Sequence, residues 1–288
     1  MIQIKKSLKK NIRRILSFSS QVHDEKTLPM YQYIPEGWNY VDEHKEVRGW
    51  NVEEILRMYE QRWEIFQKRV MGKDPLGYSL EADPDSAPNI NTQNTILCFA
   101  YCLALLACNH SRVSILDWGG GIGQYYVIAQ ALFPRLDVDY HCKDFELFTT
   151  LGKRYLPNVN FYTDETCLVN TYDFVLVSGA IQYSRDWDNV LIGLANATGE
   201  YLLLTRLPIV EQVPSFTFLQ RAYKFGFNTE FLSWCFNKTE LMKKAESSGL
   251  KLVREFVVGD SLPIVNAPEK CQYSGYLFQK IDKSRIFT

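Results

Sequence analysis

The sequence predicts an α/β protein in which a mostly parallel sheet is covered by helices on both faces. Three observations lead to this prediction. From about residue 91, short apolar β-type runs alternate with helical patterns, as in repeated βα units. A glycine-rich stretch, ILDWGGGIGQYY at 115–126, lies between one such run and the helix pattern after it. The 288 residues, 46% hydrophobic and 23% charged, are enough for one large domain with an appendage.

The first 20 residues differ from the rest of the chain in charge. They carry six basic side chains and no acid, which leaves −7 for the remainder of a chain whose net charge is −1. Their apolar residues recur every three or four positions, which predicts a basic amphipathic helix over 1–20. Such a helix binds an anionic membrane surface through residues 1–18, packs on its own domain, or frays as a tail. The mildly acidic remainder is not typical of a domain that binds nucleic acid.

Residues 21–90 are predicted to form a helical and irregular extension that caps the main domain. Asn51 and Glu54 have the spacing of a capping box, and a helical stripe of apolar residues follows them. The segment DPLGYSLEADPDSAPN at 74–89 is rich in Pro, Asp and Ser, which is typical of a loop. We place the start of the main domain, 91–288, after this loop.

The main domain is predicted to contain a seven-stranded sheet whose last strand inserts antiparallel. Its helices are expected at 92–108, 123–133, 146–154, 186–196 and 238–248. Its strands are expected at 112–117, 137–143, 159–163, 171–180, 200–209, 250–258 and 274–280. Before the last helix, residues 210–236 form an aromatic insertion with no clear period.

The cysteine pattern indicates a reduced, intracellular protein. The seven cysteines are odd in number and include no C-x-x-C pair, so we expect small, mostly buried thiols. Cys98 and Cys102 are one helical turn apart, but no second Cys/His pair completes a zinc site, so no metal is expected. The apolar run Ile96–Cys108 is shorter than the ~20 residues that span a bilayer. Because no secretory signal is evident, we expect a cytoplasmic protein, attached to the inner face of the membrane if the basic helix binds there.

The glycine-rich stretch departs from both common phosphate-binding loops. Reading from Gly119, the dinucleotide pattern G-x-G-x-x-G meets Gln124 where the third glycine should stand, and no Lys-Ser/Thr pair follows as in a P-loop. An acid two residues before the first glycine repels a phosphate but attracts a cation. S-adenosylmethionine fits this pattern, because its ammonium can lie near the acid while the glycines admit its methionyl and ribose groups. The predicted cofactor-binding residues of this loop are Asp117, Gly119, Gly120, Gly121 and Gly123.

Polar residues follow the other parallel strands at the same edge of the predicted sheet. Asp144 ends the second strand, where an acid binds ribose hydroxyls; the alternative is a helix N-cap. Thr163 or Asp164, after the third strand, is expected to meet the adenine amino group. Ser178 and Gly179 end the fourth strand and are expected beside the reactive sulfonium.

Three further residues are candidates for the reaction itself. Gln182 and Tyr183 follow the fourth strand, and Arg206 ends the fifth. We expect Arg206 to bind a carboxylate or phosphate of the acceptor, or else to form a structural ion pair.

The four histidines supply no evident general base for a sugar hydroxyl. His141 lies in a predicted strand and is expected to be a core residue, and His110 ends a predicted helix. His23 and His44 belong to the extension and are placed to reach the site from above.

Several blocks of this sequence resemble one protein family. ILDWGGGIGQYY, YHCKDFELFTTLG, DFVLVSGAIQY, TRLPI followed by FTFLQ, and YSGYLFQK are similar to a family of class I methyltransferases commonly encoded with bacterial surface-polysaccharide biosynthesis. The resemblance covers about Trp50 to Lys280. It implies the Rossmann-like class I methyltransferase fold, S-adenosylmethionine as cofactor and a sugar or glycan acceptor. The family's second strand usually ends in Glu where this chain has Asp144, and either acid binds ribose.

Together, these features predict an S-adenosylmethionine-dependent enzyme that O-methylates a sugar or glycan intermediate. The aromatic segments 28–66 and 210–236 are expected to contact this small-molecule or glycan acceptor. One alternative is a nucleotide- or NAD-linked sugar-modifying enzyme, which the missing third glycine disfavours. The other is a non-catalytic, methyltransferase-like binding module.

Overall fold

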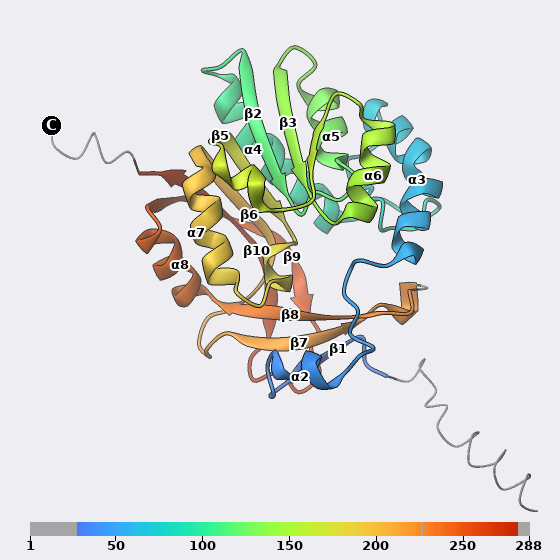
Figure 1. Cartoon of the computed structure of the whole chain (residues 1–288), viewed down its shortest axis with the longest axis vertical. Coiled ribbons are helices and arrows are strands. Elements are labelled where there is room, and N and C mark those ends of the chain that lie inside the picture. Colours follow the sequence, from blue (N-terminus) through green and yellow to red (C-terminus); the bar gives the residue numbers. More distant parts are fainter. Residues whose placement is uncertain (1–27, 226, 282–288) are drawn as a thin grey trace, which may run out of the picture.

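The computed structural model describes residues 28–225 and 227–281, which form an α/β body around a large sheet (Figure 1). The predicted helix over 1–20 lies outside the described residues. The main part of the sheet has the strand order β4-β3-β2-β5-β6-β10-β9. These strands are β2 (Arg112–Trp118), β3 (Asp137–Lys143), β4 (Asn160–Tyr162), β5 (Tyr172–Ser178), β6 (Thr198–Val210), β9 (Leu250–Leu262) and β10 (Cys271–Lys280).

The strand directions match the predicted sheet. β2, β3, β4, β5 and β6 run parallel to their neighbours in this group. β10 runs antiparallel to both β6 and β9, so the predicted antiparallel insertion of the last strand is confirmed. A mostly parallel sheet of this kind places the polar residues that follow its strands along one edge.

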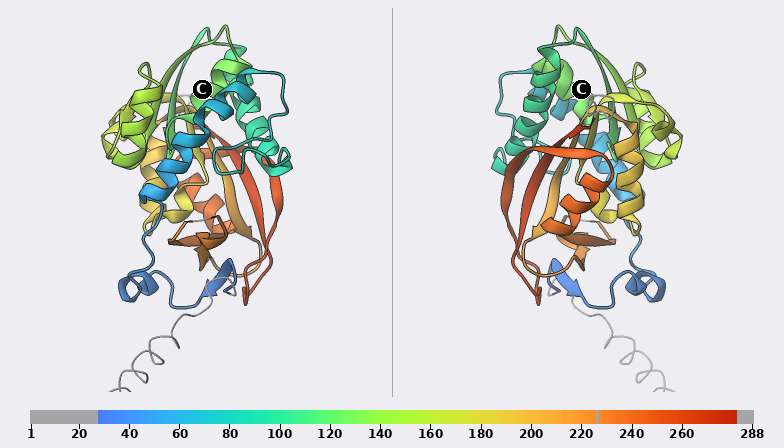
Figure 2. Two further views of the ribbon diagram at one scale, coloured as in Figure 1. Left: turned by 90° about the vertical axis from the view of Figure 1, so that its right-hand side faces the viewer. Right: turned by 90° about the vertical axis from the view of Figure 1, so that its left-hand side faces the viewer.

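Helices cover both faces of this sheet, as the two side views in Figure 2 show. One face carries α4, α5 and α6, with α3 packed against α5 and α6, and the other carries α7 and α8. Their bounds are α3 (Glu53–Met71), α4 (Ile90–Ala107), α5 (Gln124–Leu132), α6 (Glu146–Tyr155), α7 (Trp187–Ala197) and α8 (Lys238–Ser247). The five helices predicted for the main domain are therefore all present.

Strand side chains divide between two apolar clusters, one on each face of the sheet. On β5, Phe174 and Leu176 belong to the cluster beneath α4 and α5, whereas Val175 and Val177 belong to the cluster beneath α7. A strand buried on both faces has no reason to alternate apolar with polar residues. This double burial explains the continuous apolar run that the sequence shows at β5.

Within the described residues, α4 is the one helix that is long and apolar enough to cross a membrane. In the structure it packs on the sheet, where Phe99, Cys102, Leu103 and Leu106 are fully buried. The ring of Phe99 lies 5.9 Å from that of Phe174 on β5. This packing agrees with the prediction of a buried core helix.

The aromatic insertion at 210–236 contains a β-hairpin that the sequence pattern did not reveal. β7 (Phe216–Arg221) pairs antiparallel with β8 (Glu230–Asn237), and β1 (Tyr31–Ile34) from the extension pairs with β7. Nearly every residue of the two hairpin strands is buried, so no polar alternation marks them. These strands enlarge the sheet to ten strands instead of the predicted seven.

The hairpin closes onto the ends of the central strands around an apolar cluster of its own. The end of β8 pairs with the end of β6, and Gln32 on β1 bridges to Val265, which follows β9. We call the enclosed buried residues the hairpin cluster: Val210, Phe216, Phe218, Cys235, Leu262, Ile264 and Cys271.

The extension differs from the prediction in two details. Strand β1 and the short helix α2 (Asn39–Glu43) lie where largely irregular structure was expected. The predicted capping box is wrong, because α3 starts at Glu53 after Val52 and no side chain caps it. Val52 is buried against the α3 side of the core, so packing rather than a cap determines where the helix begins.

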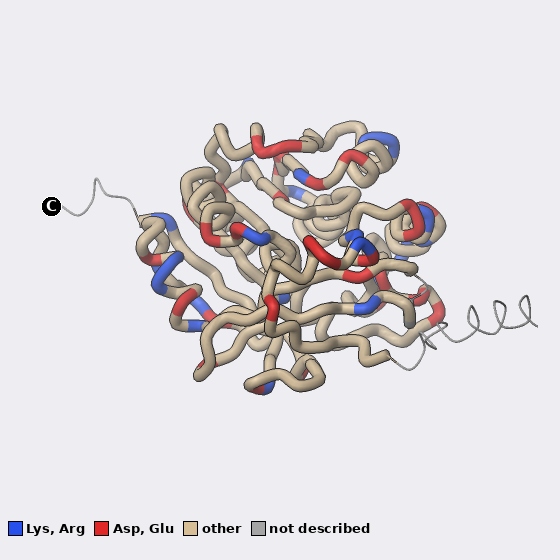
Figure 3. The backbone as a smooth tube through the Cα atoms, turned by 60° about the horizontal axis from the view of Figure 1, so that its bottom comes forward, with Lys and Arg blue, Asp and Glu red and all other residues tan. Residues whose placement is uncertain are grey.

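Charged residues are distributed over the described fold. Figure 3 shows both signs of charge along the backbone, and α3, α6 and α8 each carry basic and acidic residues, whereas α4 and α5 carry none. Typical pairs are Arg57 with Glu53 on α3, and Lys244 on α8 with Asp188 on α7. Opposite charges therefore neutralise one another locally over the described surface.

Candidate functional site

The glycine loop joins β2 to α5 at the edge where the parallel strands end. The backbone N–H groups of Gly119 and Gly120 donate to the carbonyl of Lys143, at 2.8 and 3.2 Å, which ties the loop to the end of β3. Gly119, Gly121 and Gly123 have φ angles of 77°, 61° and 87°. Only glycine adopts such left-handed angles without strain, which explains its recurrence at alternate positions.

Close packing is a second reason for glycine in this loop. A Cβ at Gly119 would lie 2.3 Å from the Cβ of Ala180, beyond the end of β5. A Cβ at Gly120 would lie 2.3 Å from Oδ2 of Asp117. At Gly121 the nearest atom is 3.6 Å away, on the ring of Tyr59 of α3, so this glycine faces the extension.

Asp117 lies beneath the glycine loop and is only 1% exposed. The hydroxyl of Tyr140 donates to its Oδ2 at 2.7 Å, while Oδ1 is buried without a hydrogen-bond partner. Burial raises the pKa of this carboxyl to about 7. A buried charged oxygen without a partner is costly, so a nearby positive charge would stabilise the ionised form of Asp117.

Asp144 connects the end of β3 to the glycine loop. Its Oδ2 accepts from the N–H of Gly121 and its Oδ1 from the N–H of Phe145, both at 2.7 Å. Burial raises its pKa. The structure thus brings Asp144 beside the loop, and its contact with ribose stays a prediction. Phe145, whose N–H it binds, directly precedes α6, which has no side-chain cap.

The residues predicted to contact the adenine group lie at the surface. Thr163 and Asp164 follow β4 and are both exposed. The carboxylate of Asp164 accepts from the hydroxyl and from the N–H of Thr166, and the second bond caps the 3₁₀ helix η2 (Glu165–Val169). These hydrogen bonds lower the pKa of Asp164. Asp164 therefore has a structural partner, and its adenine contact stays a prediction.

Trp118, Lys143 and Glu165 form a neighbouring cluster that the sequence did not indicate. Nε1 of Trp118 donates to Glu165 at 3.0 Å, and Nζ of Lys143 pairs with the same carboxylate at 2.7 Å. The ammonium of Lys143 also lies 4.6 Å from the centre of the Trp118 ring. This cluster forms the border of the site between β2, β3 and η2.

The end of β5 carries Ser178 and Gly179, as predicted. Oγ of Ser178 is 2.8 Å from the hydroxyl of Tyr125 on α5. The N–H of Gly179 donates to the carbonyl of Thr205 on β6 at 2.9 Å. With a φ of 67°, Gly179 leaves room for the guanidinium of Arg206, whose Nε would lie 3.3 Å from any added Cβ.

Arg206 occupies a β-bulge in β6. Gly275 of β10 faces both Thr205 and Arg206, because the pairing skips from Leu204 to Leu207. Arg206 has a φ of 58°, which is strained for a residue with a side chain. Bulges re-aim side chains and are common beside functional sites. The side-chain amide of the buried Gln182 donates to the carbonyl of Arg206 at 3.4 Å and so supports this backbone, while its Oε1 has no hydrogen-bond partner. Its predicted catalytic role stays a prediction.

Glu81 is the partner of Arg206 and was not singled out from the sequence. Their Oε2 and Nη2 atoms are 3.0 Å apart, and this carboxylate is the main reason why the pKa of Arg206 is raised. The hydroxyl of Tyr59 lies 3.4 Å from the other Glu81 oxygen. Arg62 holds the loop in place by donating to the carbonyls of Leu80 and Glu81 at 3.1 and 3.0 Å.

Arg206 and Glu81 face a cavity of about 170 Å³, which we call the acceptor cavity after the role that we propose for it. Its walls come from α3, the 72–89 loop, α4, α5 and strands β6, β9 and β10. Phenols of Tyr125 and Tyr273 line it, and the buried Oε1 of Gln124 has no hydrogen-bond partner. The cavity thus combines one ion pair, several hydroxyl groups and an acceptor atom that a ligand can satisfy.

Tyr183 lies between the extension and the hairpin. Its hydroxyl donates to Oε1 of Gln220 on β7 at 3.2 Å, and the ring of Trp50 meets its edge at 5.5 Å. Burial raises the pKa of this phenol. Because the phenol is neutral and already hydrogen-bonded, its predicted catalytic role stays a prediction.

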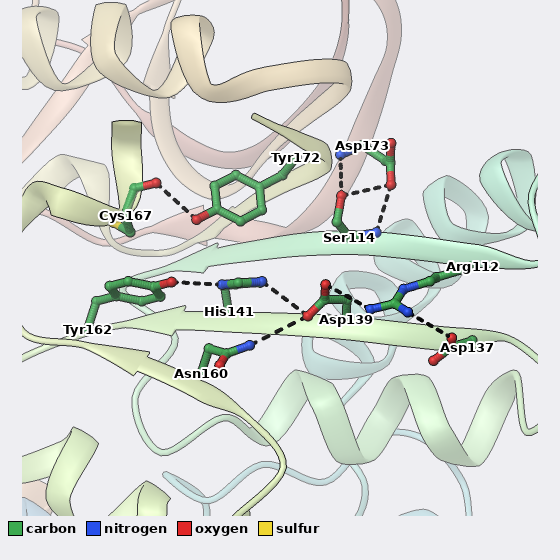
Figure 4. Close-up of polar contacts among 10 residues, drawn as sticks. All are labelled: Arg112, Ser114, Asp137, Asp139, His141, Asn160, Tyr162, Cys167, Tyr172 and Asp173. Atoms are coloured by element: carbon green, nitrogen blue, oxygen red, sulfur yellow. Dashed lines mark hydrogen bonds and ion pairs between the residues drawn. The ribbon is translucent and has the colours of Figure 1, made fainter. Parts of the chain in front are cut away.

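The described histidines are engaged elsewhere. His141 lies on β3 between the hydroxyl of Tyr162, 3.0 Å from Nδ1, and the carboxylate of Asp139, 3.2 Å from Nε2 (Figure 4). His110 pairs with Glu200 at 2.7 Å, and His44 stacks on Tyr40 at 3.8 Å. His23 lies outside the described residues. Among those residues, no group of His, Cys, Asp or Glu is arranged to hold a metal ion.

Solved structures share this architecture. The "putative sarcosine dimethylglycine methyltransferase" of Galdieria sulphuraria aligns at 16% identity with a TM-score of 0.51, over 80% of this chain and 99% of that chain. The chain has the fold of a class I methyltransferase. No family model and no curated protein matches the sequence.

A further class I methyltransferase structure aligns less closely. The magnesium protoporphyrin IX methyltransferase of Synechocystis PCC 6803, solved with bound S-adenosylmethionine, shows 13% identity and a TM-score of 0.47, over 77% of this chain and 90% of that chain. At identities this low, the likeness concerns the fold, and each named activity belongs to the protein that carries it.

Proposed function

We propose that this protein is an S-adenosylmethionine-dependent methyltransferase that acts on a small-molecule acceptor. The observation that carries the proposal is the loop of three left-handed glycines, which Asp144 of the next strand binds through the N–H of Gly121. Beneath this loop, Asp117 presents a buried carboxylate oxygen without a partner. A sulfonium cofactor supplies an electrophilic methyl group, and the ammonium of its methionyl part suits such an acid.

The residues around the loop have distinct proposed roles. Asp144 would accept hydrogen bonds from the ribose hydroxyls, and Asp117 would favour the positive charge above Gly120. Ser178 and Gly179, at the end of β5, border the place where the methionyl part would lie. Thr163 and Asp164 remain the proposed neighbours of the adenine.

The acceptor cavity favours a neutral, hydroxylated acceptor. Arg206 is already neutralised by Glu81, so an anionic acceptor must displace that carboxylate, whereas a hydroxyl group can bind with the ion pair intact. Orientation of the reacting oxygen contributes much of the rate of such a transfer. We therefore propose a sugar or glycan intermediate as acceptor, methylated on oxygen, in line with the sequence resemblance. A basic helix at 1–18 would suit an acceptor carried on an anionic membrane.

Isothermal titration with S-adenosylmethionine tests the cofactor assignment. We expect binding by the wild-type chain and a loss of roughly 10–100-fold in affinity for Asp144→Ala, because charge-assisted hydrogen bonds contribute about 1.5–3 kcal/mol each. The matched control is Asp74→Ala, which removes an exposed aspartate of the 72–89 loop and should bind as wild type. Folded wild-type protein that fails to bind S-adenosylmethionine but binds NAD would instead support the nucleotide-linked alternative.

A second experiment tests the acceptor. Labelled methyl donor is incubated with the protein and a cell extract, and the labelled product is identified by mass spectrometry. A methylated carbohydrate is expected. A product with no carbohydrate part would refute the glycan assignment and leave the methyltransferase assignment in place. Cofactor binding without any transfer would favour the non-catalytic binding module.

A further inference from the structure

Two thiols meet inside the hairpin cluster. Sγ of Cys235 on β8 lies 3.0 Å from Sγ of Cys271, the first residue of β10. Both residues are 0% exposed. Their separation is about 1 Å longer than a disulfide bond of ~2.05 Å, so a small shift of two side chains would join them.

The pair bridges the hairpin and the central sheet at a place where their strands do not pair with each other. On the central side, β10 is paired along its length with β6 and β9. The hairpin strand β8 is paired with β6 only at Ile209–Phe236 and Val210–Asn237. A covalent bond between Cys235 and Cys271 would therefore fasten the hairpin to the central sheet.

We propose that Cys235 and Cys271 form a disulfide bond when the protein is exposed to a peroxide, which acts as the two-electron oxidant. One thiol reduces hydrogen peroxide, becomes a sulfenic acid and releases water. The sulfur of the second thiol attacks the sulfenic sulfur, which forms the S–S bond and releases a second water. The two thiols lose two electrons and two protons, and the O–O bond of the peroxide is broken.

Burial determines how this site responds. Because neither sulfur is exposed, the oxidant reaches the pair only when the hairpin opens, and oxidation is slower than at the exposed Cys108. Burial also raises the pKa of the Cys235 thiol. The buried thiol therefore stays protonated and unreactive while the hairpin is packed on the sheet. Once one thiol is oxidised, the other is the nearest nucleophile. The bond between Cys235 and Cys271 therefore forms faster than a bond to a distant cysteine.

The disulfide would act on the acceptor cavity. Tyr273, two residues after Cys271 on β10, lines that cavity. Gln220, on the hairpin strand β7, accepts a hydrogen bond from the hydroxyl of Tyr183. Joining residues 36 positions apart also restricts the unfolded chain. We expect oxidation to raise the melting temperature by roughly 5–8 °C.

Peptide mapping of the full chain tests this site directly. Protein purified under reducing conditions is treated with hydrogen peroxide at increasing temperature below its melting point, alkylated, and digested without reduction. The expected product is one peptide pair that joins Cys235 to Cys271 and separates on reduction. A parallel alkylation without peroxide shows the temperature at which both thiols become accessible.

Variants separate the site from general oxidation. Cys235→Ser and Cys271→Ala should each abolish both the linked peptide and the rise in melting temperature, whereas Cys108→Ser should keep both. The proposal is overturned if wild-type protein, oxidised at a temperature where both thiols are accessible, yields them unlinked or linked to other cysteines. The mapping of the wild-type chain decides this even if a buried substitution prevents folding.

Discussion

The two halves of the site differ in how the chain assembles them. In the cofactor half, Gly121 and Asp144 are 23 residues apart, and each lies within three residues of the end of a strand of the same βαβ unit. In the acceptor half, Arg206 meets Glu81 across 125 residues, and Tyr183 meets Gln220 on an inserted hairpin. Local geometry therefore fixes the first half, while the second depends on how the extension and the insertion pack against the sheet.

Gly119→Ala should have the largest effect and is confined to the cofactor half. It adds a Cβ at a φ of 77°, 2.3 Å from the Cβ of Ala180. We expect a loss of about 3 kcal/mol in unfolding free energy, together with loss of S-adenosylmethionine binding. Denaturant melts and calorimetry measure these effects.

A matched variant separates strain from overlap at Gly119. Gly249→Ala has a φ of 81° but no atom within 4 Å of the added Cβ, so it should lose only about 1–2 kcal/mol and bind normally. Equal losses in both variants would contradict the close packing of the loop against β5.

Asp117→Asn should remove a pH dependence from the cofactor half. The pKa of Asp117 is about 7 in the folded chain against an ordinary 3.8, so the folded state holds a proton between pH 4 and 7 that the unfolded state has lost. Stability should therefore fall as pH rises through this window, by at most about 1.4 kcal/mol per pH unit. Denaturant melts at pH 5 and pH 7.5 should show this slope in wild type and a flatter one in Asp117→Asn.

The same carboxyl should influence cofactor affinity in the opposite direction. Deprotonation above pH 7 supplies the negative charge that favours a cation, so S-adenosylmethionine should bind more tightly at pH 8 than at pH 5.5. Asp117→Asn should remove this difference in calorimetry. A wild-type affinity that does not change with pH would argue against Asp117 as the group beneath the cation.

Arg206→Lys and Glu81→Gln test whether the two halves are independent. Arg206→Lys replaces the planar guanidinium by a shorter ammonium and Glu81→Gln removes the negative charge, so each disturbs the ion pair that faces the acceptor cavity. We expect transfer of labelled methyl groups to extract acceptors to fall on the order of 10²-fold. Affinity for S-adenosylmethionine should stay near the wild-type value. Arg57→Ala, which breaks an exposed pair on α3, is the control. Parallel losses of cofactor affinity would show that the halves are coupled.

Asn89→Ala, at the start of α4, should have the smallest effect on stability and binding. The Asn89 side chain accepts from the N–H groups of Asn91 and Thr92 and caps α4, whose first turn lines the acceptor cavity. Loss of such a cap costs about 1 kcal/mol. Denaturant melts should show this loss relative to Asn158→Ala, an exposed position, with cofactor affinity unchanged.

The helices and strands of the main domain were predictable because each has a local signature. Apolar runs such as TYDFVLVS mark doubly buried strands, and the five predicted helices are all present. The hairpin was missed because its strands are buried on both faces and rich in aromatic residues, so they show no alternation. The prediction of a capping box at Asn51 was wrong because the burial of Val52 sets the start of α3. The local sequence pattern does not reveal that burial.

The sequence by itself determined the seven strands of the main sheet, the glycine loop and the placement of Asp144 beside it, because residues at the ends of neighbouring parallel strands meet at one edge. Only the tertiary structure decided that Glu81 pairs with Arg206, that Gln182 supports a strained backbone, and that Cys235 meets Cys271. These contacts join segments that are distant in the chain, and no local preference for helix or strand encodes which distant partner a side chain will meet. Long-range packing therefore defines the acceptor half of the site.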